Sequence, residues 1–164
     1  MAPMDEIAVE VLKPADQRSS DGQSVDAAVV AAFARLIPLL SSSAPIPDAR
    51  RVARVLGHPA NTVFAARTVP DGRILGLLTL VAIELPTGPE ARIEDVVVDE
   101  SARGLGLGRA LVTAALDAAA AAGARYVDLT SAPHRVSARA LYQAMGFEVR
   151  ETGVFRHQLA DYPR

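Results

Sequence analysis

The sequence predicts an α/β domain with a mixed β-sheet and helices on its faces. Strand-like and helix-like runs follow one another in the order β-α-α-β-β-β-α-β-α-β-β, which is typical of this class. The run Arg103–Gly108 (RGLGLG) separates an apolar, strand-like segment from an Ala/Leu-rich, helix-like one, as a strand–turn–helix unit requires. We therefore expect about six or seven strands and about four helices.

The first half of the chain predicts a strand, two helices and a hairpin. Ser24 and Asp48 are residue types that cap helix N termini, and Pro38 should distort the last turn of the first helix. Pro70-Asp71-Gly72 is strong turn chemistry, so the two apolar runs beside it should pair as antiparallel strands. The expected ranges are Ile7–Leu12, Val25 to about Leu40, Asp48–Leu56, Thr62–Val69 and Arg73–Leu85.

The second half predicts a strand, a helix, a strand, a helix and two weaker strands after a turn at Pro86–Glu90. Gly123 should end the first of these helices, and Gly146-Phe147 predicts a Schellman-type end for the second. The expected ranges are Arg92–Asp99, Leu107–Ala122, Arg125–Thr130, Pro133–Met145, Glu148–Arg150 and Val154–Leu159.

The composition predicts one domain over residues 1–164, with flexible ends at 1–5 and 160–164. The net charge of -2 gives no reason to expect nucleic-acid or bulk membrane binding. The longest apolar run, Ile74–Leu85, is too short for a membrane span, and the N-terminus lacks a basic signal region, so we expect a cytoplasmic protein. No cysteine is present and the 3 histidines are not closely spaced, so no metal site is expected.

The glycine run predicts an anion site, because glycines allow backbone N–H groups to turn inward before a helix N terminus. Arg103 and Arg109 add positive charge. The dinucleotide fingerprint G-x-G-x-x-G fails, because Arg109 occupies its third glycine position. A Walker A motif is excluded, because the chain has no Gly-Lys pair. The remaining pattern is Arg-x-x-Gly-x-Gly over residues 103–108.

This pattern resembles the pyrophosphate loop of the GNAT superfamily of acyl-CoA N-acyltransferases. The strand Ile93-Glu94-Asp95-Val96-Val97-Val98-Asp99 precedes it, and Ala138–Phe147 (ARALYQAMGF) looks like the family's A-x-x-L-Y-x-x-x-G-F segment. Residues 93–147 carry the resemblance, whereas the N-terminal half agrees in element order only.

The resemblance implies acetyl-CoA, or another acyl-CoA, as the donor, bound in a V-shaped opening between the parallel strands Ile93–Asp99 and Arg125–Thr130. The pantetheine arm would pair with backbone in this opening. Arg135 stands where the family usually has an asparagine that binds pantetheine, so that role would pass to Ser137 or be absent. The implied cofactor-binding residues are Val96, Val97, Val98, Arg103, Gly104, Leu105, Gly106, Leu107, Gly108, Arg109, Ser137 and Tyr142.

The resemblance also implies catalytic roles. Tyr142 matches the family's tyrosine that protonates the departing thiolate, although a Leu-Tyr pair in a helix is often only core packing. Glu94 is our preferred base for the amine, and Asp95 is the second candidate; on a regular strand the two point to opposite faces. Glu84, near the end of its own strand, and His134 are weaker candidates. His134 has a suitable intrinsic pKa, but at a helix start it is as easily a surface residue.

The expected reaction is direct acyl transfer to a primary amine in a ternary complex, in which a backbone N–H of Val96 or Val97 stabilises the oxyanion. The acceptor, a small molecule or a peptide, is not specified by the sequence, although the Val25–Gly57 helices and the Glu148–Leu159 segment should flank its side. Homodimers are common in the family. The alternatives are a non-catalytic acyl-CoA-binding module and, from the loop alone, a nucleotide-binding protein.

Overall fold

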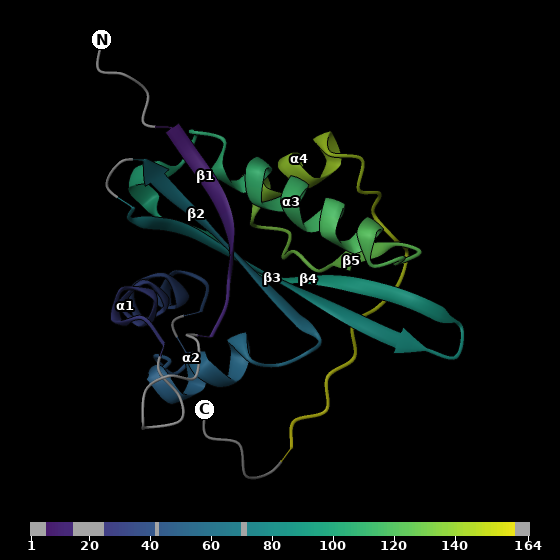
Figure 1. Cartoon of the computed structure of the whole chain (residues 1–164). Coiled ribbons are helices and arrows are strands. Elements are labelled where there is room, and N and C mark those ends of the chain that lie inside the picture. Colours follow the sequence, from purple (N-terminus) through teal and green to yellow (C-terminus); the bar gives the residue numbers. More distant parts are fainter. Residues whose placement is uncertain (1–5, 15–24, 42, 70–71, 160–164) are drawn as a thin grey trace. The chain divides into compact units, whose positions relative to one another are not determined.

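The computed structural model describes residues 6–14, 25–41, 43–69 and 72–159. The chain divides into two compact units, residues 1–130 and 131–164. Among the residues just given, the first unit holds one sheet and the helices α1, α2 and α3, and the second unit holds α4 (Figure 1). The elements are β1 (Glu6–Leu12), α1 (Ala27–Leu36), η1 (Ile37–Leu39), α2 (Ala49–Leu56), β2 (Asn61–Val69), β3 (Ile74–Leu85), β4 (Gly88–Val98), η2 (Glu100–Ala102), α3 (Leu107–Ala121), β5 (Val127–Leu129) and α4 (Val136–Ala144).

The sheet confirms the predicted α/β class. Its strand order is β1-β2-β3-β4-β5, with antiparallel pairing from β1 through β4 and parallel pairing of β4 with β5. Helix α3 makes the crossover between the two parallel strands, as that connection requires. The described strands number five, fewer than the six or seven expected.

The core of the first unit lies on both faces of the sheet. Helices α1 and α2 cover one face and α3 the other (Figure 1). Along β2, Val63 and Ala65 pack in the cluster formed with α1 and α2, and the alternate residues Phe64 and Ala66 are also buried. The cluster is composed of Leu12, Val29, Ala32, Phe33, Leu36, Val52, Leu56, Val63, Ala65, Ile74, Leu77 and Val97.

Local sequence sets the ends of α1 and α2. Asp26 caps α1, its carboxylate accepting from the N–H of Ala28 at 2.7 Å, whereas the predicted cap Ser24 lies outside the described residues. Helix α1 ends at Leu36, earlier than expected, because Pro38 lacks an N–H and the chain continues as the 3₁₀ helix η1. Asp48 caps α2 as predicted, accepting from the N–H of Arg51 at 2.7 Å.

The hairpins form as expected, but β4 begins earlier than Arg92. Leu85 pairs with Gly88, so only two residues make the turn and the predicted turn segment Pro86–Glu90 is largely strand. The β2–β3 pairing is antiparallel, while Pro70 and Asp71 of its predicted turn lie outside the described residues. Strand β5 is shorter than Arg125–Thr130 and, among the described strands, lies at the edge of the sheet.

Strand β4 contains a bulge that the sequence does not reveal. Thr79 of β3 pairs with Glu94, but the next pair is Leu77 with Val97, so two residues of β4 face Leu78. One of these two is Asp95, whose φ of 53° lies in the left-handed region. An extra residue of this kind bends a strand and interrupts its ladder. Paired residues share a face, so Glu94 lies on the Leu77 and Val97 face, the face covered by α1 and α2.

Helix α3 approaches the sheet closely at Gly76 of β3. A Cβ on this glycine would lie 3.0 Å from Leu111 Cδ1 and 3.2 Å from the Val97 carbonyl oxygen. Leu111 is fully buried, so it has little room to move away. The absence of a side chain at Gly76 therefore sets how near the helix that follows the glycine loop lies to β3.

The second unit holds α4 and its predicted C-terminal motif. Phe147 N–H donates to the Tyr142 carbonyl at 3.0 Å, and Gly146 N–H donates to the Gln143 carbonyl at 3.1 Å, the two bonds of a Schellman end. The rings of Tyr142 and Phe147 meet edge to face, with centroids 5.8 Å apart. Helix α4 begins at Val136 rather than Pro133, because residues 133–135 lie in a turn that leads into it.

The two strands expected at Glu148–Arg150 and Val154–Leu159 do not form. These residues make no strand in the described chain, and their apolar members Val149, Val154 and Phe155 are exposed. A strand needs a partner for its backbone groups, and the second unit contains no other strand among its described residues. The prediction of flexible ends at 1–5 and 160–164 concerns residues outside the described ranges. The single-domain organisation also stays a prediction.

Candidate functional site

The glycine loop lies between β4 and α3, as predicted. Strand β4 ends at Val98, the short helix η2 follows, and α3 begins at Leu107. Gly104 and Gly106 have φ values of 81° and 86°, in the region where an L side chain is strained. A Cβ on either glycine would meet nothing within 4 Å, so the loop surface is open at both positions. The glycines are therefore required by backbone conformation rather than by crowding.

The loop presents a row of backbone donors. In the described part of the chain, the N–H groups of Gly104, Gly106, Leu107, Gly108 and Arg109 donate to no acceptor. Gly106 is the N-cap of α3 and provides no side chain to satisfy them. Such donors, together with the positive end of the α3 dipole, form a site that favours anions.

The loop is exposed from Arg103 to Gly106 and becomes buried at Leu107. Leu107 is buried and anchors the start of α3, whereas Leu105 is 60% exposed. Arg103 and Arg109 are exposed, which leaves their guanidinium groups accessible to a ligand. Arg103 contacts the exposed carboxylate of Glu100 at 3.3 Å, a pair that solvent screens strongly.

The strand before the loop has an unpartnered edge. β5 pairs with β4 only at Ala91, Arg92 and Ile93. Beyond Ile93, no described strand pairs with the β5 side of Glu94–Val98. The pairing stops where the opening between the two parallel strands is expected to begin, and their divergence beyond this point stays a prediction. The bulge at Asp95 lies where the pairing stops, which gives a physical reason for it, since a bulge bends its strand.

Two carboxylates lie at this point of β4. Glu94 Oε1 is 3.1 Å from Nε of Arg92, and both side chains are partly exposed. Desolvation raises the pKa of the Asp95 carboxyl above its ordinary value, and the neighbouring Glu94 carboxylate raises that pKa further. Asp95 as a residue is exposed, so solvent screens much of this effect. The bulge interrupts the regular geometry of the strand at Asp95, which has a φ that regular strand residues do not adopt, and the opposite orientation of the Glu94 and Asp95 side chains stays a prediction.

Tyr142 lies on α4 and is buried, with 9% of its surface exposed. Burial raises the pKa of the Tyr142 phenol above its ordinary value, and the guanidinium of Arg135 partly offsets this. The phenol is therefore protonated at neutral pH. Tyr142 and Ser137 belong to the second unit, so their approach to Glu94 and the loop stays a prediction.

The remaining sequence candidates are surface residues. Glu84 on β3, and His134 and Ser137 in the second unit, are exposed. Within the described ranges, no group of three or more His, Asp or Glu side chains could hold a metal ion. None of the described helices is long and apolar enough to cross a bilayer.

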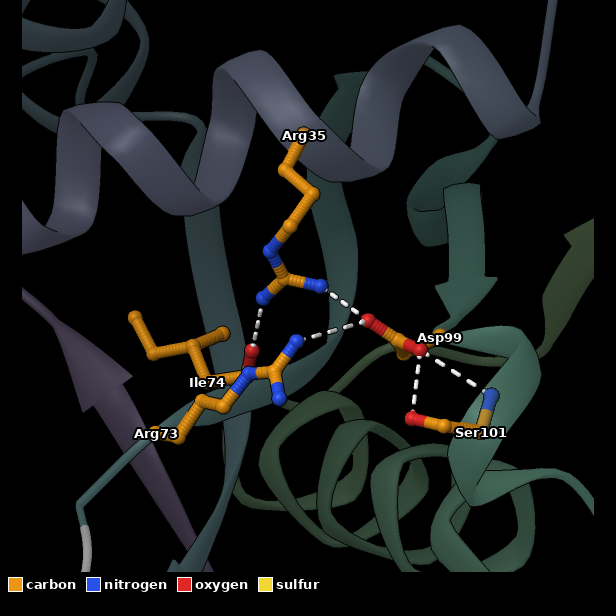
Figure 2. Close-up of polar contacts among 5 residues, drawn as sticks. All are labelled: Arg35, Arg73, Ile74, Asp99 and Ser101. Carbon is orange, nitrogen blue, oxygen red and sulfur yellow. Dashed lines mark hydrogen bonds and ion pairs between the residues drawn. The ribbon is translucent and has the colours of Figure 1, made fainter.

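Sequence reasoning missed the polar contacts that surround Asp99, directly before η2. Its Oδ1 accepts from Ser101 N–H at 3.0 Å and Ser101 Oγ at 2.7 Å, and its Oδ2 pairs with Arg35 of α1 (Figure 2). The Asp-x-Ser turn signal was readable in the sequence, since aspartate commonly accepts from the residue two positions later. No local signal connects Arg35 to Asp99.

The fold agrees with comparisons to known proteins. The family model described as acetyltransferase (GNAT) family matches residues 33–147, which is more than half of the chain. No curated protein sequence matches. The chain therefore belongs to the GNAT acetyltransferase family and is an N-acyltransferase.

Solved structures are similar over nearly the whole chain. A putative acetyltransferase from Agrobacterium tumefaciens str. C58 is 26% identical, with a TM-score of 0.74 over 92% of this chain and 99% of that one. An aminoglycoside acetyltransferase from an uncultured soil metagenomic sample, in complex with trehalose, is 23% identical, with a TM-score of 0.76 over 94% and 97%. Glucosamine-6-phosphate N-acetyltransferase from Arabidopsis thaliana is 17% identical, with a TM-score of 0.73 over 93% and 99%. The last two similarities show the fold alone.

Proposed function

We propose that this enzyme transfers the acetyl group of acetyl-CoA to a primary amine by direct attack within a ternary complex. The observation that carries the proposal is the row of free N–H groups within Gly104–Arg109, at the N terminus of α3. The pyrophosphate of CoA is an anion suited to this row, with Arg103 and Arg109 beside it. The unpartnered edge of Val96–Val98 offers backbone groups to the pantetheine amides.

In the proposed reaction the amine nitrogen attacks the thioester carbonyl and forms the new C–N bond. Glu94, directly or through one water, takes the proton that the amine loses. A backbone N–H of Val96 or Val97 donates to the oxygen of the tetrahedral intermediate; such a donor typically contributes about 3 kcal/mol. The C–S bond then breaks, and the Tyr142 hydroxyl protonates the departing thiolate.

The structure supports these roles in two respects. Glu94 lies on the sheet face covered by α1 and α2, the helices expected to flank the acceptor. Burial raises the pKa of the Tyr142 phenol, so this group is protonated at neutral pH and carries a proton that it can donate. The absence of cysteine from the sequence excludes an acyl-cysteine intermediate.

The acceptor is proposed only as a primary amine. Acetyltransferases of aminoglycosides and of glucosamine-6-phosphate share this fold, and both names describe amino sugars as substrates of those proteins. Identities of 23% and 17% do not extend that substrate to this chain.

The test is an acetyl-CoA consumption assay over a library of small amines, amino sugars and peptides. We expect CoA release with at least one acceptor, and stabilisation of the protein by acetyl-CoA but not by NAD or ATP. Stabilisation by ATP or NAD, with none by acetyl-CoA, would contradict the proposal that acetyl-CoA is the acyl donor. Tight acetyl-CoA binding with no release across the whole library would contradict transfer to an amine.

A further inference from the structure

Asp99 contacts three elements through separate atoms, and Figure 2 shows its side-chain contacts to Arg35 of α1 and Ser101 of η2. Its N–H donates to the Leu75 carbonyl of β3 at 2.7 Å. Its Oδ1 holds the first turn of η2 through Ser101, and its Oδ2 pairs with Arg35 from the last turn of α1. Only the η2 residues and Arg103 separate Asp99 from Gly104, the first glycine of the loop that carries the free N–H groups.

Arg35 in turn contacts two partners. One guanidinium nitrogen donates to Asp99 Oδ2 and the other to the Ile74 carbonyl (Figure 2). Arg73 adds a more distant contact, with Nη2 3.7 Å from Oδ2. The Asp99 side chain is only 14% exposed and that of Arg35 is 35% exposed, so water competes weakly for the carboxylate. A two-pronged guanidinium contact of this kind fixes direction as well as distance.

We propose that Asp99, held by Arg35, is a positioning residue that fixes the Arg103–Gly108 loop in the conformation that receives the pyrophosphate of acyl-CoA. This inference rests on the proposed function, because it assumes that the loop binds acyl-CoA. It goes further by assigning a role to α1, which has no residue in the loop itself. A loop whose N–H groups already point at the ligand loses less conformational entropy on binding.

The charge state of Asp99 agrees with this role. The side-chain and backbone hydrogen bonds from Ser101 lower the pKa of the Asp99 carboxyl below its ordinary value, and Arg35 and Arg73 lower that pKa further. The pKa is depressed in the folded protein, so the stabilisation is fully present above about pH 4 and disappears as the pH falls below it. The Asp99 carboxylate is therefore charged at neutral pH and keeps its contacts with Arg35 and Ser101.

The test uses calorimetry to compare CoA binding by the wild-type chain with CoA binding by variants that lack the ion pair between Arg35 and Asp99. Asp99→Asn keeps an oxygen for Ser101 but removes the charge that faces Arg35, and Arg35→Met removes the guanidinium. Each variant should raise the Kd for CoA about tenfold. The double variant should have a Kd no higher than the higher of the two single-variant values, because both changes break the same ion pair. Glu10→Gln, which breaks the exposed Arg67–Glu10 pair on β1 and β2, is the matched control and should leave the Kd unchanged.

Binding of pantetheine, which lacks the pyrophosphate, distinguishes a loss of loop positioning from a general loss of protein stability. Its affinity should be the same for the wild type and for Asp99→Asn. An unchanged Kd for CoA in Asp99→Asn, or an equal loss for CoA and pantetheine, would overturn the inference. If Asp99→Asn does not fold, Ser101→Ala tests the Asp99 contacts from the loop side, with a several-fold weaker CoA affinity expected and no change overturning the inference. Failure of the wild type to bind CoA would instead contradict the proposed function.

Discussion

Arg92 and Glu94 form an ion pair along β4, with Nε of Arg92 3.1 Å from Oε1 of Glu94. They are two residues apart and lie before the bulge, so their side chains share a face of the strand. The pair orients the carboxylate that we propose as the base. Arg92 belongs to the part of β4 that pairs with β5, whereas Glu94 is the first residue beyond that pairing.

Replacing Glu94 by glutamine should remove the base and leave the shape of the site unchanged. We expect kcat to fall about 100-fold or more, with little change in the KM for acetyl-CoA, because a general base typically contributes about 10²- to 10⁴-fold. Steady-state kinetics with the acceptor found in the amine library measures this. Asp95→Asn is the matched control, and a large loss there with none in Glu94→Gln would assign the base to Asp95 instead.

Replacing Tyr142 by phenylalanine removes the hydroxyl but keeps the ring that meets Phe147. We expect a large fall in kcat and a nearly unchanged Kd for CoA, because the phenol acts only on the departing thiolate. Burial raises the pKa of Tyr142, so the wild-type phenol stays protonated, and the rate should lose this proton donor only at a pH above the ordinary titration range of tyrosine. A pH–rate profile that falls near neutral pH and is identical in Tyr142→Phe would exclude the tyrosine as that acid.

Alanine at Gly106 should weaken CoA binding through the backbone. The φ of 86° becomes strained for an L residue at a cost of about 1 to 2 kcal/mol, and relaxation of that strain would turn the loop N–H groups away. Gly72→Ala is the matched control, because Gly72 has a φ of 64° and equally open surroundings in the β2–β3 connection. Both variants should melt at a lower temperature, but only Gly106→Ala should lose CoA affinity in calorimetry. Equal affinities for CoA in the two variants would contradict the loop as the anion site.

Alanine at Gly76 should destabilise the first unit and leave the conformation of the glycine loop unchanged. Its Cβ would lie 3.0 Å from Leu111 Cδ1, and overpacking of a core typically costs about 1 to 3 kcal/mol. Urea unfolding measures the loss. Leu111→Val in the same protein should recover part of it, because the smaller side chain relieves the contact. If the changes in the free energy of unfolding caused by the two substitutions simply add, the methyl group introduced at position 76 and Leu111 are not in steric conflict.

The parts of the fold that the sequence predicts are those controlled by neighbouring residues. Asp48 caps α2, Gly146-Phe147 ends α4, and the glycine loop lies before α3, all as expected. Each depends on residues within one turn of chain. The family resemblance likewise rests on two short motifs, and the matched range of residues 33–147 includes both.

The features that the sequence does not predict depend on pairing between distant residues. The bulge at Asp95 follows from the register with Thr79 and Leu77 of β3, and nothing within β4 itself signals it. The Arg35–Asp99 pair joins positions 64 apart. The strands expected at Glu148–Arg150 and Val154–Leu159 do not form, because the sequence of a segment does not supply the partner strand that a ladder needs.

The extra residue of β4 also bears on how far this protein could be stabilised. A strand without the left-handed residue at position 95 would be straighter, and β5 could then pair with it beyond Ile93 and gain hydrogen bonds. The same pairing would cover the backbone that we assign to pantetheine. Thermostability selected at this point of the sheet would therefore be gained at the expense of catalysis, so engineering for heat resistance should leave the length of β4 unchanged.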